Sequence, residues 1–315
     1  MGNGEPRVHV WRRRGQPHNS KGVIRFGPAG WDYPDWSGAV YPKPAPRGFD
    51  PLAYLSRWFD AVEVNSTFYR PQRPEVARAW CERVAARRSF RFTAKLWKRL
   101  THEREVYGAE EVGAARAALD AIAEQGRLGA VLVQFPWSFR RDAAALEWLR
   151  DLFRALSGLP LVLEVRHASW NVPETYAELA EQGVGFVNVD QPLFRRSMGP
   201  SAVATAGVGY VRVHGRNYKD WFRENAGRDA RYDYLYTADE LAPWAERTKA
   251  IAEQARVEDV YVVTNNHFQG KAVANAAMLQ AMVDARRVAV PPDLFARYHA
   301  ALARFVKEEG QQRLL

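Results

Sequence analysis

The chain has 315 residues, of which 47% are hydrophobic and 26% charged, the composition of a globular protein large enough for one α/β barrel. It contains one cysteine, Cys81, which excludes an intramolecular disulfide and a cysteine-rich zinc site. Its net charge of +9 is compatible with an anionic ligand or nucleic acid, and no apolar run approaches the roughly 20 residues that cross a bilayer.

The first 21 residues are expected to be a basic, disordered tail. They are polar, contain Gly and Pro, and have no hydrophobic periodicity. The stretch also lacks an apolar signal core, so we expect a cytoplasmic protein without membrane contact. Residues 22–315 are expected to form one domain. Part of the net charge lies in the tail, in Arg7, Arg12, Arg13, Arg14 and Lys21 against only Glu5.

Eight β-runs alternate with helical patterns along the rest of the chain. The β-runs are Val23–Gly27, Ala61–Asn65, Phe90–Lys95, Ala130–Gln134, Leu161–Arg166, Val184–Asp190, Gly209–His214 and Val260–Asn265. The helical patterns are Glu75–Arg87, Glu110–Gln125, Asp142–Ser157, Glu174–Glu181, Ala238–Ala255 and Lys271–Ala285, with Leu294–Val306 as a closing helix outside the barrel.

This alternation predicts the fold class. Strands separated by helices form parallel sheets, and eight such units favour closure into a single (β/α)8 TIM-type barrel with parallel strands and outer helices. No Gly-x-Gly-x-x-Gly motif follows the first β-run, which argues against a dinucleotide-binding fold.

The β-runs end in polar residues that the period of two directs inward. In the fifth run Glu164 and Arg166 share one face, while Leu163 and Val165 take the other. Barrel enzymes carry their active sites at this carboxyl-terminal mouth. The same alternation predicts an inward ring of Glu63, Asn65, Thr93, Lys95, Gln134, Asn188, Asp190, Arg212, His214 and Asn265.

The ring has a structural and a functional interpretation. One pair alone, such as Glu164 with Arg212, is more simply a salt bridge that holds the barrel. A whole ring favours function, because a barrel that needs only stability fills its interior with Val, Ile and Leu. Glu63 and Glu164 are then candidates for general acid and base, and Lys95, Arg166 and Arg212 for holding an anion. Asn65, Gln134, Asp190, His214 and Asn265 are expected to orient the ligand.

A divalent metal is the weaker hypothesis for this ring. Glu63, Glu164, Asp190 and His214 could meet, with His102 and His267 on nearby loops. No His-x-His or His-Glu-x-x-His spacing accompanies them, so no metal ligand and no cofactor is assigned.

The loops after several strands mix basic and aromatic residues, which can hold phosphates and stack on bases or sugars. Packing of these aromatics onto the barrel explains them equally well. Trp31, Arg216 and Tyr234 are the candidate binding residues. The wider set includes Tyr33, Trp36, Trp97, Arg195, Arg196, Tyr218, Trp221, Arg223, Arg228, Arg231, Tyr232 and Tyr236.

Several of these segments together resemble one family. They are Gly27-Pro28-Ala29-Gly30-Trp31, Glu63-Val64-Asn65-Ser66-Thr67-Phe68-Tyr69, Lys95 with Thr101-His102, Gln134-Phe135-Pro136, Glu164-Val165-Arg166-His167-Ala168-Ser169-Trp170, Arg212-Val213-His214-Gly215-Arg216, Arg231-Tyr232-Asp233-Tyr234-Leu235-Tyr236 and Asn265-Asn266. In this order they resemble the YecE-like proteins, also called domain of unknown function 72, from Val23 to about Ala285. The resemblance implies a single-domain TIM barrel without an established activity.

Three functions are consistent with these observations. The first is an enzyme of the hydrolase, lyase or isomerase kind that acts on a small anionic, phosphorylated or sugar-like substrate. The second is a nucleic-acid-binding protein, such as a repair protein, in which the basic and aromatic loops carry the contacts. The resemblance also implies, by analogy alone, a relation to phosphate-directed sugar isomerase and apurinic endonuclease barrels. The sequence lacks the spread of His and acid ligands of a three-metal nuclease. The third is a binding barrel without turnover, so the sequence leaves catalysis itself open.

Overall fold

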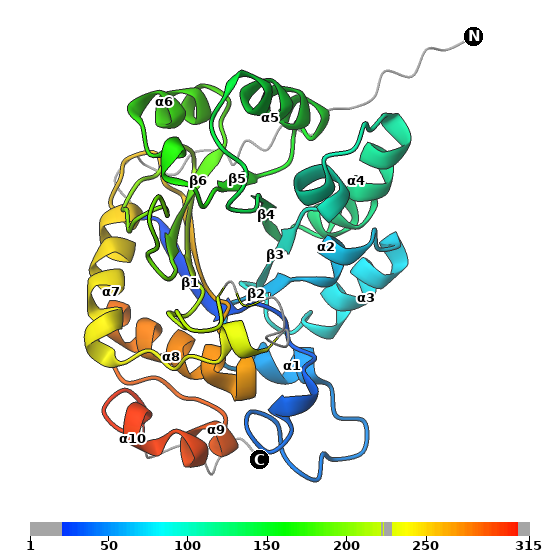
Figure 1. The fold of residues 1–315 in the computed structure, drawn as a ribbon. Coiled ribbons are helices and arrows are strands. Elements are labelled where there is room, and N and C mark those ends of the chain that lie inside the picture. The colour runs from blue at the N-terminus through cyan, green and yellow to red at the C-terminus, as the bar shows by residue number, and fades with distance from the viewer. Residues whose placement is uncertain (1–20, 222, 224–228, 308–315) are drawn as a thin grey trace.

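Eight parallel strands form the centre of the protein in a computed structural model that describes residues 21–221, 223 and 229–307 (Figure 1). They follow the order β1-β8-β7-β6-β5-β4-β3-β2 around one sheet. Their bounds differ from the predicted β-runs by only one or two residues, so the predicted TIM-type fold is confirmed. The strands are β1 (Val23–Pro28), β2 (Ala61–Val64), β3 (Arg91–Lys95), β4 (Leu128–Gln134), β5 (Leu161–Glu164), β6 (Gly185–Asp190), β7 (Val208–Val213) and β8 (Asp259–Thr264).

The barrel closes between its first and second strands. A parallel bridge joins Ala29 to Glu63, and the Gly30 amide donates to the Glu63 carbonyl at 2.8 Å. A Cβ added at Gly27 would lie 1.7 Å from the carbonyl oxygen of Ala61, so only glycine allows β1 and β2 to approach this closely. Closure brings the ends of all eight strands to one mouth.

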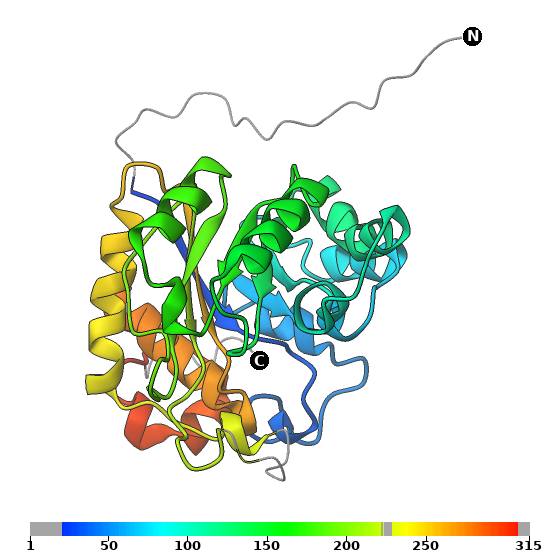
Figure 2. The same cartoon turned by 45° about the horizontal axis from the view of Figure 1, so that its top comes forward.

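Helices surround the strands on the outside, as Figures 1 and 2 show. Their first turns carry capping residues, for example Asp50, which accepts from the amides of Leu52 and Ala53, and the Thr237–Glu240 capping box. The helices are α1 (Pro51–Leu55), α2 (Ser66–Tyr69), α3 (Pro74–Arg83), α4 (Ala109–Glu124), α5 (Ala143–Ala155), α6 (Pro173–Glu181), α7 (Ala238–Ala252) and α8 (Lys271–Asp284). Short 3-10 turns lie at Pro34–Trp36, Ala168–Trp170, Ala230–Tyr232 and Phe268–Gly270, and a π-helical turn at Arg99–Glu103.

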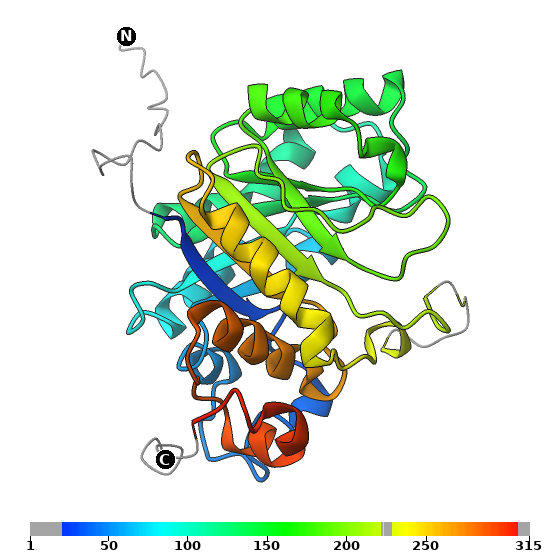
Figure 3. The same cartoon turned by 90° about the vertical axis from the view of Figure 1, so that its left-hand side faces the viewer.

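The single closing helix predicted at Leu294–Val306 is wrong. This segment forms two short helices, α9 (Pro292–Arg297) and α10 (His299–Leu302), which lie outside α8 (Figure 3). Tyr298 separates the two helices with φ −114° and ψ 30°, and its hydroxyl donates to the carbonyl of Gln269 at 2.7 Å. Leu294 and Leu302 are both fully buried, so the break lets each short helix pack its apolar side.

The predicted tail, residues 1–21, lies outside the described residues except for Lys21, which pairs with Glu253 at 2.7 Å. Within the described ranges, no helix combines the length and the apolar character needed to cross a membrane.

Candidate functional site

Strand register decides which side chains enter the barrel. Arg212 of β7 is level with Val263 of β8 and Val189 of β6, and Gln134 of β4 is level with Glu164 of β5. Neighbouring parallel strands direct level residues to the same face. Glu63 and Arg212 meet across the barrel, so this face is the interior.

A buried network of two carboxylates and one guanidinium crosses the interior. Arg212 Nε and Nη2 donate to the two oxygens of Glu63 at 3.0 and 2.6 Å, and Nη1 donates to Glu164 Oε2 at 3.1 Å. The Tyr210 hydroxyl donates to Glu63 at 2.9 Å and contacts Thr93 at 2.9 Å. Glu63 and Glu164 are 0% exposed and Arg212 only 1%, so this guanidinium compensates part of the negative charge inside the protein.

The second oxygen of Glu164 joins two further residues. Arg166 Nη2 donates to Oε1 at 2.9 Å, and His214 Nε2 lies 3.1 Å from the same oxygen. The Asn265 amide donates to His214 Nδ1 at 3.1 Å, which assigns the proton of the neutral ring to Nε2. His214 therefore links Glu164 to Asn265 at the mouth.

The pKa values in this network follow from burial and neighbouring charge. Burial opposes ionisation of Glu164, but Arg212, His214 and Arg166 outweigh it and hold its pKa well below the ordinary value. Burial opposes the charge of Arg212 in the same way, yet Glu63 and Glu164 raise its pKa. Burial and the nearby Arg166 lower the pKa of His214 to about 3, so this histidine is neutral.

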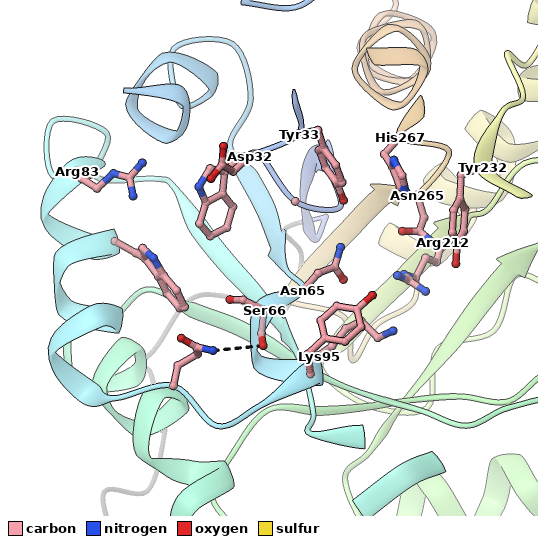
Figure 4. Close-up of a pocket in the computed structure, with 15 residues that line it drawn as sticks. Asp32, Tyr33, Asn65, Ser66, Arg83, Lys95, Arg212, Tyr232, Asn265 and His267 are labelled. Carbon is pink, nitrogen blue, oxygen red and sulfur yellow. Dashed lines mark hydrogen bonds between the residues drawn. The ribbon is translucent and has the colours of Figure 1, made fainter. Parts of the chain in front are cut away.

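Above the network lies a cavity of about 430 Å³. Figure 4 shows its lining, with Lys95, Asn65 and Arg212 close to one another. Amides, hydroxyls, aromatic rings and cations all contribute, which suits a small polar molecule. The cavity is lined by Gly30, Trp31, Asp32, Tyr33, Asn65, Ser66, Tyr69, Gln72, Trp80, Arg83, Lys95, Arg212, Tyr232, Asn265 and His267.

Lys95 differs from the other cations of this lining. Arg83 is paired with Asp50, and Arg212 with its two carboxylates. The Lys95 ammonium group lies 3.8 Å from the centre of the Phe68 ring, and no ion pair or hydrogen bond joins it to a described residue. Burial, with Arg212 as the next cause, lowers the pKa of Lys95 to about 7.

The inward orientation predicted for Asn188 and Asp190 is wrong. Both are level with residues of β7 that face the helices, Val211 and Val213. Asp190 accepts from the Tyr236 hydroxyl at 2.7 Å and from Trp244 Nε1 of α7, on the outside of the sheet. The prediction failed because β6 places Val187 and Val189 inward and its polar residues outward, which reverses the usual hydrophobic pattern.

Three other predicted binding residues have protein partners and lie outside the cavity lining. Arg216 makes a two-bond contact with Asp190 at 2.9 and 2.6 Å. The Tyr234 hydroxyl donates to Glu240, and Gln134 donates to the carbonyl of Phe135 at 2.9 Å. In the wider loop set, the ring centre of Trp221 lies 5.6 Å from Cζ of Arg166. Arg228 falls outside the described residues.

The family described as "Protein of unknown function DUF72" matches residues 25–297 of this chain. The chain belongs to the DUF72 family. This confirms the resemblance to YecE-like proteins read from the ordered motifs.

Proteins similar to this DUF72 chain match it along most of their own length. The UPF0759 protein YunF of Bacillus subtilis strain 168 is 27% identical over 294 residues, which cover 87% of this chain and 100% of YunF. The crystal structure of a DUF72 family protein (TM1631) from Thermotoga maritima MSB8 matches with 30% identity and a TM-score of 0.71, over 83% of this chain and 99% of that one. A DUF72 family protein (EF0366) from Enterococcus faecalis V583 has 23% identity and a TM-score of 0.71, over 83% and 96%.

Metal-ligating side chains do not gather at the mouth of this DUF72 barrel in the part that the structure describes. No group of three His, Cys, Asp or Glu residues there has an arrangement that could hold an ion. The grouping proposed from sequence is incomplete because Asp190 lies on the opposite face of β6 from Glu164 and His214.

The cavity also includes aromatic residues from the loops and from one helix. Tyr33 stacks on His267 with ring centroids 4.4 Å apart, and Tyr232 lies 4.9 Å from the same ring. Tyr33 and Tyr232 belong to the wider loop set, and His267 was named as a possible metal ligand. Trp80 comes from α3, meets Trp31 edge-on at 5.7 Å and was not among the sequence candidates. It lies on a helix, where the strand period of two has no predictive value.

Proposed function

We propose that this DUF72 protein is an enzyme of the isomerase or lyase type that acts on a small, negatively charged, sugar-like compound in the mouth cavity. The observation that carries the proposal is Lys95, an amine in the lining without a carboxylate partner among the described residues. Unpaired buried cations are rare in proteins unless a ligand compensates them.

The charge balance of the site supports an anionic ligand. Glu63 and Glu164 are matched by the two guanidinium groups of Arg212 and Arg166, and His214 is neutral. A protonated Lys95 is then an excess positive charge. Arg212 uses three of its five N–H groups on the carboxylates, so further donors are available for a phosphate or carboxylate of the ligand.

The rest of the lining suits a hydroxylated molecule. Asn65, Asn265 and Gln72 provide amides, which donate to and accept from hydroxyl groups. Trp31 and Trp80 provide apolar ring surface of the kind on which sugar rings pack. The volume of about 430 Å³ lies within the range of small-molecule sites.

Isomerase or lyase chemistry fits better than hydrolysis. Hydrolysis by a carboxylate pair requires both groups to reach the substrate, and Glu63 and Glu164 are fully buried and bonded to Arg212 below the cavity. An amine with a pKa of about 7 is largely available in its neutral form at neutral pH, where it can act on a carbonyl group, and Lys95 has this property. In this proposal the two carboxylates hold Arg212 in position and do not exchange protons with the substrate.

Thermal unfolding with defined compounds tests the proposal. Ribose 5-phosphate is expected to raise the Tm, while ribose and inorganic phosphate separately have a smaller effect. Lys95→Met should remove the increase, and the matched variant Lys98→Met should keep it, since Lys98 pairs with Glu103 outside the lining. No stabilisation by any sugar phosphate would contradict the proposal.

Two further measurements separate the alternatives. A nucleic-acid binder would bind short single-stranded DNA with an affinity that falls steeply as salt concentration rises. A barrel without turnover would be stabilised by the sugar phosphate but would not catalyse exchange of the proton next to the carbonyl group with deuterated water. The proposed enzyme is expected to catalyse this exchange and to bind the DNA weakly.

A further inference from the structure

The location of Lys95 allows its amine to contact a ligand in the cavity. It is the last residue of β3, at the mouth end of the barrel, and its side chain lines the cavity. Its carbonyl accepts from the Thr67 hydroxyl at 2.7 Å, and its ammonium group rests on the Phe68 ring. Both partners belong to α2, so this helix fixes the backbone and the side chain of Lys95 together.

The surroundings of Lys95 favour a neutral amine. Arg212 and Arg166 add positive charge nearby, and the charges of Glu63 and Glu164 are already matched by these guanidinium groups. Four of the other described lysines have carboxylate partners instead, such as Lys249 with Glu246 at 2.9 Å. A neutral amine in a positively charged pocket is a nucleophile toward carbonyl carbon.

We propose that Lys95 is a catalytic residue that forms an imine with the carbonyl group of the substrate. This inference rests on the proposed function, because it specifies the substrate as a ketone or aldehyde. The amine nitrogen attacks the carbonyl carbon, a C–N bond forms, and the oxygen leaves as water with both protons of the amine. Protonation of the imine restores one positive charge at this position, so the charge balance with an anionic substrate is kept.

The imine lowers the barrier of the isomerase or lyase step. A protonated imine accepts the electron pair of a neighbouring C–H or C–C bond and becomes an enamine, while the C–H proton passes to solvent water or the C–C bond releases a carbonyl fragment. A counterion role alone would be served equally well by arginine, which cannot form the imine. Substitution of Lys95 by arginine therefore separates charge from nucleophilicity.

Reductive trapping with glycolaldehyde and cyanoborohydride at pH 7 tests the inference on the full chain. Glycolaldehyde has no charge, so the reaction does not require the anion binding of the proposed function. Peptide mass spectrometry should find Lys95 modified faster than Lys98 and Lys219 by on the order of tenfold or more, because more of its amine is neutral. The rate at Lys95 should rise as the pH increases through about 7.

Two variants, and ribose 5-phosphate as a competitor of glycolaldehyde, give outcomes that support or overturn the inference. Lys95→Arg should abolish the fast modification and retain stabilisation by ribose 5-phosphate, while Lys98→Met should retain both. Modification of Lys95 no faster than that of Lys219, which is exposed, would overturn the inference. Ribose 5-phosphate should protect Lys95, and fast modification without protection would contradict the proposed function while leaving the reactive amine in place.

Discussion

Two acid–arginine clusters lie at the same end of the barrel, on opposite faces of its wall. The inner one joins Glu63 and Glu164 to Arg212, and the outer one joins Asp190 to Arg216. In the outer cluster the carboxylate accepts from a guanidinium, a hydroxyl and an indole, all supplied by elements packed against it. The inner cluster borders a cavity and Lys95, which forms no ion pair within the described part of the chain.

The two clusters consist of the same residue types, but the outer one joins structural elements and the inner one borders a cavity. The outer carboxylate of Asp190 connects β6 to the loop after β7 and to α7 through hydrogen bonds, and Arg216 lies between this carboxylate and the solvent. The inner carboxylates hold Arg212 under the cavity, with Lys95 beside it. Residue type alone predicts charge in both places, and only the face of the strand decides whether a ligand can reach it.

Removal of the inner guanidinium should have the largest effect. Arg212→Met leaves Glu63 and Glu164 buried without their shared partner, and such a change typically costs about 3–5 kcal/mol. Urea denaturation measures this loss as a lower midpoint at an unchanged slope. A loss below about 1 kcal/mol would show that the inner cluster does not hold the barrel.

Neutralisation of Glu164 should cost about 3 kcal/mol at pH 7, and the cost should depend on pH. The folded-state pKa of Glu164 is lowered, so its carboxylate stabilises the fold above the unfolded pKa of about 4.5, and this stability is lost as the pH falls toward the folded value. Glu164→Gln should therefore differ most from wild type at neutral pH and progressively less below about pH 4.5. Denaturation at a series of pH values measures the difference, and a constant difference would contradict the assigned ion pairs.

Asp190→Asn tests the outer cluster and should lower the free energy of unfolding by about 2 kcal/mol, because hydrogen bonds to a charged acceptor become weaker. The loss stays moderate because Arg216 can turn to solvent. Stabilisation by ribose 5-phosphate should be unchanged, since Asp190 lies outside the cavity lining. Isothermal titration compares the affinities of the two proteins. A large loss of affinity for ribose 5-phosphate would show that Asp190 contributes to ligand binding, and would contradict a purely structural role for the outer cluster.

Lys95→Met should have the opposite sign and a smaller effect, a gain of about 1 kcal/mol at pH 7, because it removes a partly buried charge that has no ion-pair partner among the described residues. The pKa of Lys95 falls to about 7 in the folded state, so its protonated form is disfavoured there. Its destabilising effect is constant below about pH 7 and fades as the pH rises toward the unfolded value of about 10.4. The Tm difference between variant and wild type should shrink accordingly, whereas Lys98→Met should stay within about 0.5 kcal/mol of wild type.

The sequence predicts the barrel well because each strand is a short apolar run bounded by turn residues, and parallel pairing leaves little freedom once eight runs alternate with helices. It also predicts the meeting of Glu63, Glu164 and Arg212, since all three obey the period of two. It fails at β6, where valines face the interior and Asp190 faces the helices. A buried strand is apolar on both faces, so its polar residues alone do not reveal the direction.

The cavity was harder to predict than the cluster below it. Tyr33, Tyr232 and His267 reach it from loops whose paths depend on tertiary contacts, such as the Tyr33–His267 stack. The break at Tyr298 was hidden for the same reason, since its partner Gln269 lies in another element. No local pattern encodes contacts of this kind.

Among the described residues no carboxylate pairs with the amine of Lys95, and we expect this amine to titrate near neutral pH. Heteronuclear NMR of the lysine side chains, with Lys95→Met to assign the signal, measures the titration of this amine directly. We expect a pKa of about 7 for Lys95 in the ligand-free protein and a higher value with bound inorganic phosphate, whose charge favours the protonated amine and which forms no imine. A value of about 10 in the free protein, as for an ordinary solvated lysine, would contradict it.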